Sequence, residues 1–353
     1  MKILMMPDYR SDNPYQSLLA EALQDEGVEV CFPQNYKRIF PISRLIKSQP
    51  FNVLHLHWFT PYLKGNNWLL RSIYSIKFLL DVLIAKWLGV KVVWTVHNRI
   101  SHESPFPRLE WWTQQTFIRL VDRMIVHHKN ALEELAQSYD FDHSKVDVLP
   151  HGHYRGVYGT AIDPLEARKL LDLPATGRIY LHLGMLRPYK GIEHLLEIWQ
   201  ENQVALAGNT LLIAGKALDE NYRQVLESCI ANCEGVIWHP GFVDNDRISL
   251  YFSATDVVVL PFKSILTSGS LILAMSYGKP IIAPKISSIV ETLGQADRLL
   301  YNPQDEQGLL HSLKDSTQVD LGALSQLVIQ ECDHLNWDEI GKKTRTLYQS
   351  VLE

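Results

Sequence analysis

The sequence predicts an α/β protein built from two doubly wound domains with parallel sheets. Three observations lead to this prediction. The chain has 353 residues, more than one typical domain requires. Short β-branched segments alternate with helical patterns along it. The alternation also runs as two successive series, separated by a stretch with scattered glycines and prolines. Since ligands bind at the carboxyl ends of strands in such sheets, we expect a site where the two domains face each other across a cleft.

The strands of the first series are expected at residues 2–7, 28–32, 53–58, 91–97, 123–128 and 146–150. Those of the second are expected at residues 178–184, 210–216, 236–242, 257–262, 280–284 and 298–302. A cap-like Asn336 precedes a last helix that reaches about Leu352. We therefore expect one domain at 1–155, completed by the helix at 337–353, and a second domain at 156–336.

Composition narrows the class of protein. A net charge of −5 argues against a general nucleic-acid binder, which is usually basic. The four cysteines form no paired Cys-x-x-Cys pattern, so no structural zinc is expected. Sparse cysteines, no signal peptide and no apolar run of about 20 residues favour a cytoplasmic location.

A basic loop, "LGMLRPYKG" at residues 183–191, follows the first strand of the second series. Gly184 permits a tight turn, and Arg187 and Lys190 place two cations at the carboxyl end of a strand. Such a loop is suited to neutralising a diphosphate. The alternative is an ordinary solvated basic loop.

The stretch "SILTSGSLILAMSYGKPIIAP" at residues 264–284 reads as a loop, a buried helix and a strand. The helix begins near Ser268, Gly269 and Ser270, where unpaired backbone N–H groups and the helix dipole favour an anion. Small residues there would let a phosphate approach closely. The alternative is a serine N-cap with no ligand.

Together these segments resemble the GT-B glycosyltransferases, most closely the family 4 (group 1) enzymes of bacterial polysaccharide and glycolipid assembly. The resemblance rests on "GMLRPYKGIEHLLEIW", "LLIAGKA", "HPGFVDNDRISLYFSATDVVVLPF", "SGSLILAMSYGKPIIAP", "VLHLHW" and "KVVWTVHN". It implies two Rossmann-like domains, with the C-terminal helix packing back on the first. It also implies sugar transfer from a UDP- or GDP-sugar, held by the second domain, to a saccharide or lipid-linked acceptor at the first.

The resemblance assigns roles to individual residues. Lys190 matches the family's diphosphate-binding lysine, and His97 matches a histidine that reaches the donor sugar. The donor site it implies comprises Gly184, Arg187, Lys190, Gly215, Lys216, Gly241, Phe242, Val243, Ser268, Gly269 and Ser270. Neither a metal nor a cofactor is expected, because basic side chains and the helix dipole can stabilise the leaving diphosphate. Asp244, Asn245 and Asp246 are accordingly interpreted as a helix start, with Asp246 as the N-cap.

Departures from the family pattern leave the stereochemistry open. Met185 stands where the family has an arginine, and Ile265 and Leu273 stand about where it has two glutamates. An inverting enzyme would need a general base near the acceptor hydroxyl. The candidate catalytic residues are His97, Asp12 and Glu103, with Asp8, His57 and His102 nearby. His57 is better interpreted as a core histidine, and Asp12 could cap the following helix.

Residues 68–88 mix cations with aromatic and aliphatic side chains. Such a helix could lie on an anionic membrane at the inner face of the plasma membrane, which would suit a lipid-linked acceptor. The alternative is an amphipathic helix with a wet outer face. Two other functions stay open: a sugar-nucleotide epimerase of the same fold, and a binding subunit without catalysis.

Overall fold

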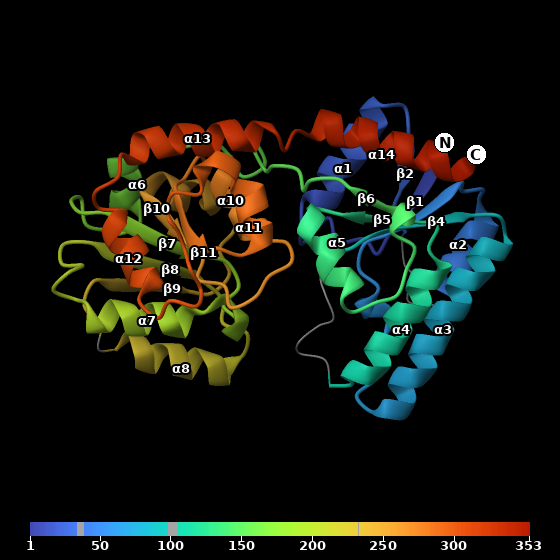
Figure 1. The fold of residues 1–353 in the computed structure, drawn as a ribbon, viewed down its shortest axis with the longest axis horizontal. Helices are drawn as coiled ribbons and strands as arrows, with labels where there is room; N and C mark the ends of the chain where they lie inside the picture. Colours follow the sequence, from blue (N-terminus) through green and yellow to red (C-terminus); the bar gives the residue numbers. More distant parts are fainter. Residues whose placement is uncertain (34–38, 98–104, 232) are drawn as a thin grey trace. The chain divides into compact units, whose positions relative to one another are not determined.

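The computed structural model describes every residue except 34–38, 98–104 and 232. The chain divides into two compact units (Figure 1). The first comprises Met1–Gly152 and Asn336–Glu353, and the second comprises His153–Leu335. Each unit is an α/β domain with its own parallel sheet.

The first unit is built on a sheet with the strand order β2-β1-β3-β4-β5-β6. All neighbouring strands pair in parallel. The central strands are buried, as expected for a parallel sheet covered on both faces. The strands are β1 (Lys2–Met6), β2 (Glu29–Cys31), β3 (Val53–Leu56), β4 (Lys91–Thr95), β5 (Arg123–Val126) and β6 (Val146–Val148).

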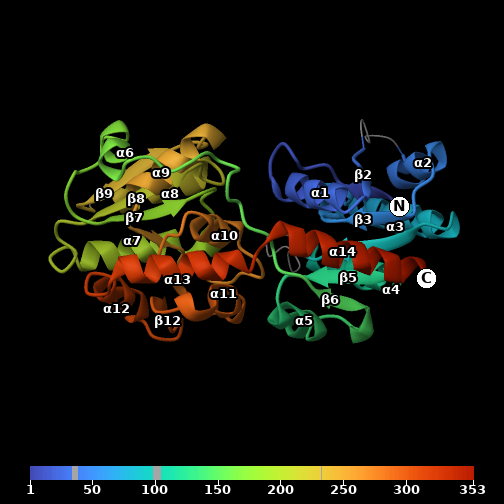
Figure 2. The same ribbon diagram turned by 90° about the horizontal axis from the view of Figure 1, so that it is seen from above.

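Helices cover both faces of this sheet (Figure 2). They are α1 (Tyr15–Asp25), α2 (Pro41–Ser48), α3 (Trp68–Trp87), α4 (Pro107–Leu120), α5 (Lys129–Ala136) and α14 (Trp337–Leu352). Polar side chains fix several of their starts. Asn67 caps α3 by accepting from the Leu70 N–H, and Asp81 on α3 accepts from the first N–H groups of α2, at Ile42 and Ser43.

The C-terminal helix α14 packs along α1 in this unit (Figure 1). Its buried side chains Trp337, Leu347 and Tyr348 join the same core as Leu19 and Leu23 of α1. The two helices approach closely at a glycine, because a β carbon on Gly341 would lie 2.7 Å from the carbonyl oxygen of Ala22. Asn336 caps the helix by accepting from the Asp338 N–H. The expected return of the last helix onto the N-terminal domain is confirmed.

The second unit has the strand order β12-β11-β10-β7-β8-β9, again with parallel pairing throughout. The direction of winding changes between β7 and β10, which makes their carboxyl ends the topological switch point. The strands are β7 (Ile179–Leu183), β8 (Thr210–Gly215), β9 (Val236–Pro240), β10 (Val257–Val259), β11 (Ile281–Pro284) and β12 (Leu300–Tyr301).

The helices of this unit are α6 (Pro164–Leu170), α7 (Ile192–Glu201), α8 (Glu220–Ile230), α9 (Ile248–Ala254), α10 (Gly269–Ser276), α11 (Ser287–Leu293), α12 (Gly308–Asp315) and α13 (Leu321–Asp333). Short 3-10 turns occur in both units, at Thr60–Tyr62, His143–Lys145, Pro188–Lys190, Asn245–Arg247 and Gly294–Ala296.

The predicted fold class is confirmed, and every strand expected from the sequence is present. The differences lie mainly at the carboxyl ends, where the expected strands run up to three residues too far. These apolar residues leave the sheet and enter the loops that line its carboxyl edge.

Candidate functional site

Three glycines form a surface without side chains at the carboxyl ends of neighbouring strands in the second unit. Gly184, Gly215 and Gly241 adjoin β7, β8 and β9 with φ of 125°, 152° and 110°. These values are costly for residues with a β carbon. A β carbon on Gly215 would lie 1.9 Å from the carbonyl oxygen of Gly184, whereas one on Gly241 would meet nothing within 4 Å. The first two backbones touch, and the third borders open space.

The Lys190 side chain lies against this surface although it is buried. It ends the 3-10 turn Pro188–Lys190, and Gly191 then adopts a φ of 72° at the start of α7. The Lys190 Nζ lies 3.1 Å from the position that a β carbon on Gly184 would take. Burial, and then the charge of Arg187, lower the pKa of Lys190 to about 8. A buried ammonium beside a second cation favours binding of an anion.

Helix α10 brings a hydroxyl to the same place. The Ser268 Oγ accepts from the Leu271 N–H at 3.1 Å and so caps the helix. The Ser270 Oγ lies 3.6 Å from the position of a β carbon on Gly184. Lys190 Nζ, Ser270 Oγ and the first turn of α10 therefore converge on Gly184, at the switch point between β7 and β10. Positive charge, a hydroxyl and a helix N-terminus together suit a phosphate group.

His182 on β7 is a further polar residue in this region that the sequence reasoning missed. It is fully buried, and its Nδ1 donates to the Val259 carbonyl oxygen of β10 at 2.9 Å. Burial and the nearby Lys190 charge lower the pKa of His182 to about 3, so the ring is neutral. Its Nε2 has no hydrogen-bond partner among the described residues. His182 was missed because it lies within an apolar strand, where the sequence pattern predicts only core residues.

The other expected donor-site residues lie on the exposed rim. Lys216 follows β8, and Phe242 is largely exposed after Gly241, with Val243 partly so. The interpretation of Asp246 as an N-cap was wrong. Asp246 lies inside the 3-10 turn Asn245–Arg247, and α9 begins only after Arg247. The turn inserts before the helix and removes Asp246 from the capping position.

A cluster of histidines lies in the first unit around the buried ring of Tyr15. The rings of His57, His97, His127 and His151 have their centroids 4.7–5.6 Å from that of Tyr15. A fifth, His55, bonds Tyr348 Oη at 2.6 Å and Thr95 Oγ1 at 2.7 Å. These residues lie at or near the carboxyl ends of β3, β4, β5 and β6.

His127, His97 and His57 form a chain of hydrogen bonds. The bond at one end of this chain determines the tautomer of each ring. The Leu149 carbonyl can only accept, so His127 Nδ1 carries the proton of their 3.0 Å bond. His127 Nε2 must then accept from His97 Nδ1 at 3.3 Å, and His97 Nε2 from His57 Nδ1 at 3.1 Å. These tautomers are assigned for neutral rings, each of which carries one proton. His57 Nε2 is then left with a lone pair, and it has no hydrogen-bond partner among the described residues.

All five rings are held neutral by burial. Desolvation lowers the pKa of His55 and His127 to about 3 and that of His151 to about 4. For His57 and His97 the pKa falls well below its usual range, because burial and neighbouring histidines both disfavour charge. The cluster therefore acts as a set of neutral donors and acceptors at neutral pH.

The expected catalytic residues fall in three different settings. His97 is buried with both ring nitrogens bonded to histidines. Asp12 is exposed. The side-chain hydrogen bond at the start of α1 is made by Asn13, whose Oδ1 accepts from the Tyr15 N–H, and not by Asp12. Glu103, like His102, lies outside the described residues. The nearby Asp8 pairs with Arg10, whose hydrogen bonds lower the pKa of that carboxyl.

Sequence reasoning missed His55, His127 and His151 as neighbours of His97. A signal was available, since each lies near the carboxyl end of an expected strand and parallel strands bring those ends together.

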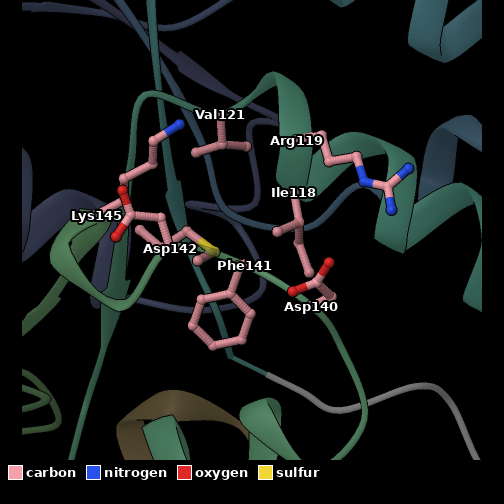
Figure 3. Close-up of a pocket in the computed structure, with 8 residues that line it drawn as sticks. Ile118, Arg119, Val121, Asp140, Phe141, Asp142 and Lys145 are labelled. Carbon is pink, nitrogen blue, oxygen red and sulfur yellow. The ribbon is translucent and has the colours of Figure 1, made fainter.

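The pocket in Figure 3 is a different feature. This cavity of about 250 Å³ is lined by residues such as Met124, Phe141 and Lys145, near the amino ends of β5 and β6. It lies at the amino ends of these strands, whereas the histidines lie at the carboxyl ends.

Comparison with known proteins gives matches in both halves of the chain. Residues 177–317 match the family profile described as glycosyl transferases group 1, and residues 28–153 match that of glycosyltransferase family 4. A GDP-mannose:glycolipid 4-beta-D-mannosyltransferase of Xanthomonas campestris pv. campestris is 27% identical over 345 residues, covering 96% of this chain and 89% of the relative.

Solved structures show the same fold at low identity. Sucrose-phosphate synthase from Thermosynechococcus elongatus has a TM-score of 0.73 and 17% identity, covering 99% of this chain and 98% of the other. Anabaena HepE in complex with UDP-glucose has a TM-score of 0.74 and 15% identity, covering 99% of this chain and all of the other.

The fold and these matches define a two-domain glycosyltransferase of the GT-B type. Within that class, the chain belongs to the group 1 glycosyltransferases, as its sequence motifs indicated. These matches favour sugar transfer over the epimerase and the non-catalytic binding subunit that the sequence left open.

Proposed function

We propose that the chain transfers a hexose from a GDP- or UDP-sugar to a lipid-linked saccharide acceptor in polysaccharide or glycolipid synthesis. The donor diphosphate binds in the second unit at Gly184, between Lys190 and the first turn of α10. The observation on which this rests is the buried Lys190 ammonium, which lies beside Gly184 together with the Ser270 hydroxyl. Desolvating this cation is costly, and an anion on the site offsets that cost.

The relatives favour a particular donor and acceptor. The mannosyltransferase of Xanthomonas campestris takes its name from GDP-mannose and a glycolipid, and its likeness extends over nearly the whole chain. Anabaena HepE has been solved with UDP-glucose, but it shares only 15% identity. We therefore favour GDP-mannose as the donor and a glycolipid as the acceptor.

Stabilisation of the leaving diphosphate is assigned to protein groups. Lys190, Arg187 and the α10 N-terminus supply positive charge where the charge on the diphosphate grows during transfer. Gly215 and Gly241, with the rim residues Lys216, Phe242 and Val243, complete the nucleotide side. We propose that neither a metal nor a cofactor takes part, so the chelator EDTA leaves the rate unchanged.

The catalytic assignments are proposals about the first unit. We propose that His97 lies next to the reacting sugar. Since both of its nitrogens are bonded, it reaches a substrate hydroxyl only when its bond to His57 or His127 opens. Asp12 and Glu103 are the carboxylates proposed for the base role if the transfer inverts configuration.

The experiment is a transfer assay with a GDP-mannose and UDP-glucose panel and a glycolipid acceptor, read by mass spectrometry. We expect one donor to be used, with transfer lost in Lys190→Ala. His97→Ala should reduce turnover at unchanged nucleoside diphosphate affinity, whereas His143→Ala, an exposed histidine of the same unit, should leave both unchanged. Full transfer by Lys190→Ala, or no transfer with any donor, would overturn the proposal.

A further inference from the structure

Helix α3 presents an apolar stripe to solvent along its whole length. Leu69, Ile73, Ile76, Leu80, Leu83 and Trp87 are each between 45% and 85% exposed. Their spacing of four and three residues places all six within about 40° of one line on a helix, over about 27 Å. Trp68 and Leu70 add exposed apolar surface at the first turn.

The opposite side of α3 already supplies the core contact of this helix. Phe78, Val82 and Ala85 are buried there, and the Phe78 ring packs against Phe59 and Phe117. The stripe is therefore not needed to hold the helix in place. The solvent-exposed face of α3 carries apolar side chains, whereas an ordinary amphipathic helix presents polar side chains there. An exposed apolar surface of this size indicates a binding surface.

The charged residues of the helices around the stripe are mostly cations. Helices α2 and α4 both pack against α3, and α3 and α4 run side by side in Figure 1. The three helices contain seven arginines and lysines and two acidic residues, a net charge of +5, although the whole chain has −5. The cations are Arg44, Lys47, Arg71, Lys77, Lys86, Arg108 and Arg119.

Both acidic residues of the three helices are buried and engaged. Asp81 accepts from the N–H groups of Ile42 and Ser43, and Glu110 pairs with Arg71. The charge that α2, α3 and α4 expose is therefore positive, although Lys86 pairs with Asp122, which follows α4. Beside the stripe, Lys77 lies over the Tyr74 ring with a flexible stem that can extend towards a polar surface. Helix α4 adds the exposed rings of Trp111 and Trp112.

We propose that this face, which we call the α3 face, docks on an anionic lipid bilayer, with the stripe inserted among the acyl chains and the flanking cations at the headgroups. An apolar stripe between cations is the pattern of helices that lie in a membrane interface. A second copy of the chain fits less well, because pairing two such faces opposes like charges. In the described residues no helix is long and apolar enough to cross a bilayer, so the contact is peripheral.

This inference deepens the proposed function, since a surface that docks on a bilayer brings the enzyme to a lipid-linked acceptor. The two can fail separately, because vesicle binding is measured without donor or acceptor. Lys190→Ala should lose the nucleoside diphosphate and keep vesicle binding. Stripe variants should do the reverse.

The experiment is vesicle flotation with the full chain. We expect binding to vesicles of equal phosphatidylglycerol and phosphatidylcholine, and at least about tenfold weaker binding to phosphatidylcholine alone or at high salt. The double variant Ile76→Glu/Leu80→Glu should lower binding at least about tenfold, and Lys77→Gln about fivefold. The matched control is Val225→Glu, which changes an exposed apolar residue on α8 and should bind as the wild type does.

Calorimetric GDP and UDP titration of each stripe variant, with its melting temperature, establishes that it is folded. The proposal is overturned if the folded double variant floats as the wild type does, or if the wild type binds both lipid mixtures equally or neither. It is also overturned if sedimentation shows a dimer that the stripe substitutions dissociate, since the face is then an interface between copies.

Discussion

The histidine cluster predicts that the first unit loses its stability steeply in mild acid. His55, His57, His97, His127 and His151 are buried and neutral, and the pKa of each is lowered by burial. In the unfolded chain each returns to a pKa of about 6.5. Below that pH the unfolded state binds more protons than the folded state, so the free energy of unfolding falls as pH falls.

The size of the effect follows from the number of groups. At pH 5.5, one unit below the unfolded value, each histidine that stays neutral when folded costs about 1.4 kcal/mol. Five such groups together cost roughly 7 kcal/mol, against a typical domain stability of about 5–15 kcal/mol. The contribution of these histidines to the free energy of unfolding is fully present above about pH 7. It declines as pH falls towards the folded pKa, which is about 3 to about 4 for His55, His127 and His151. In the described part of the second unit, His182 is the fully buried histidine, so that unit should be less sensitive.

The assay is guanidinium unfolding at pH values from 7.5 to 5.0, read by pulsed hydrogen exchange at one fixed pH. Peptides from β3 and β4 report the first unit, and peptides from β7 and β8 report the second. We expect the first unit to unfold at much lower denaturant at pH 5.5 than at pH 7.5. His127→Asn, whose amide can still donate to the Leu149 carbonyl, should remove about one proton from the pH dependence.

The control is His143→Asn, since His143 is exposed and should leave the dependence unchanged. An uptake of fewer than about two protons on unfolding at pH 5.5 would mean that the five histidines are not held neutral in the folded unit. A second unit that is as sensitive as the first would contradict the prediction too.

Further predictions concern single residues. Nitrogen NMR at neutral pH should show His57 and His97 protonated at Nδ1 and not at Nε2; an Nε2-protonated His57 would contradict the chain of bonds. Since the pKa of Lys190 is about 8, GDP or UDP affinity should fall above pH 8 with proton uptake on binding, and a flat pH profile would contradict the buried charge. Lys190→Met should abolish nucleotide binding while stabilising the unliganded second unit by on the order of 2 kcal/mol in denaturant unfolding at pH 7, because the desolvated charge is removed. Gly215→Ala should destabilise that unit by more than about 2 kcal/mol, through a clash with a neighbouring carbonyl, whereas Gly208→Ala, with positive φ but open space, should cost about 1 kcal/mol.

The fold could be predicted because parallel sheets leave a strong local signature. Buried strands such as those at Val53 and Leu211 are short and β-branched or aliphatic, and helices between strands begin with recognisable caps, as at Ser268. The ends of strands were harder to predict. Apolar residues such as Leu260 and Phe262 continue past the last paired residue because the loop beyond β10 is also buried.

The candidate site was predictable where a motif marks it and not where topology alone assembles it. Gly184, Lys190 and Ser270 lie in segments with a recognisable composition, and the structure brings them together. His182 lies within an apolar strand. His55, His127 and His151 are far apart in the sequence and meet only because their strands are neighbours in the sheet. The exposure of the α3 stripe could not be predicted either, because a buried helix has the same apolar composition.

Calorimetric titration measures directly whether the second unit holds a nucleoside diphosphate at Gly184. We would titrate GDP, UDP, ADP and TDP into the wild type, into Lys190→Ala and into Lys314→Ala, which removes an exposed lysine of the same unit. We expect selective binding of one diphosphate by the wild type and by Lys314→Ala, with affinity at least about a hundredfold weaker in Lys190→Ala. Equal affinity in Lys190→Ala, or no binding of any diphosphate to the folded wild type, would contradict binding of the diphosphate at Gly184.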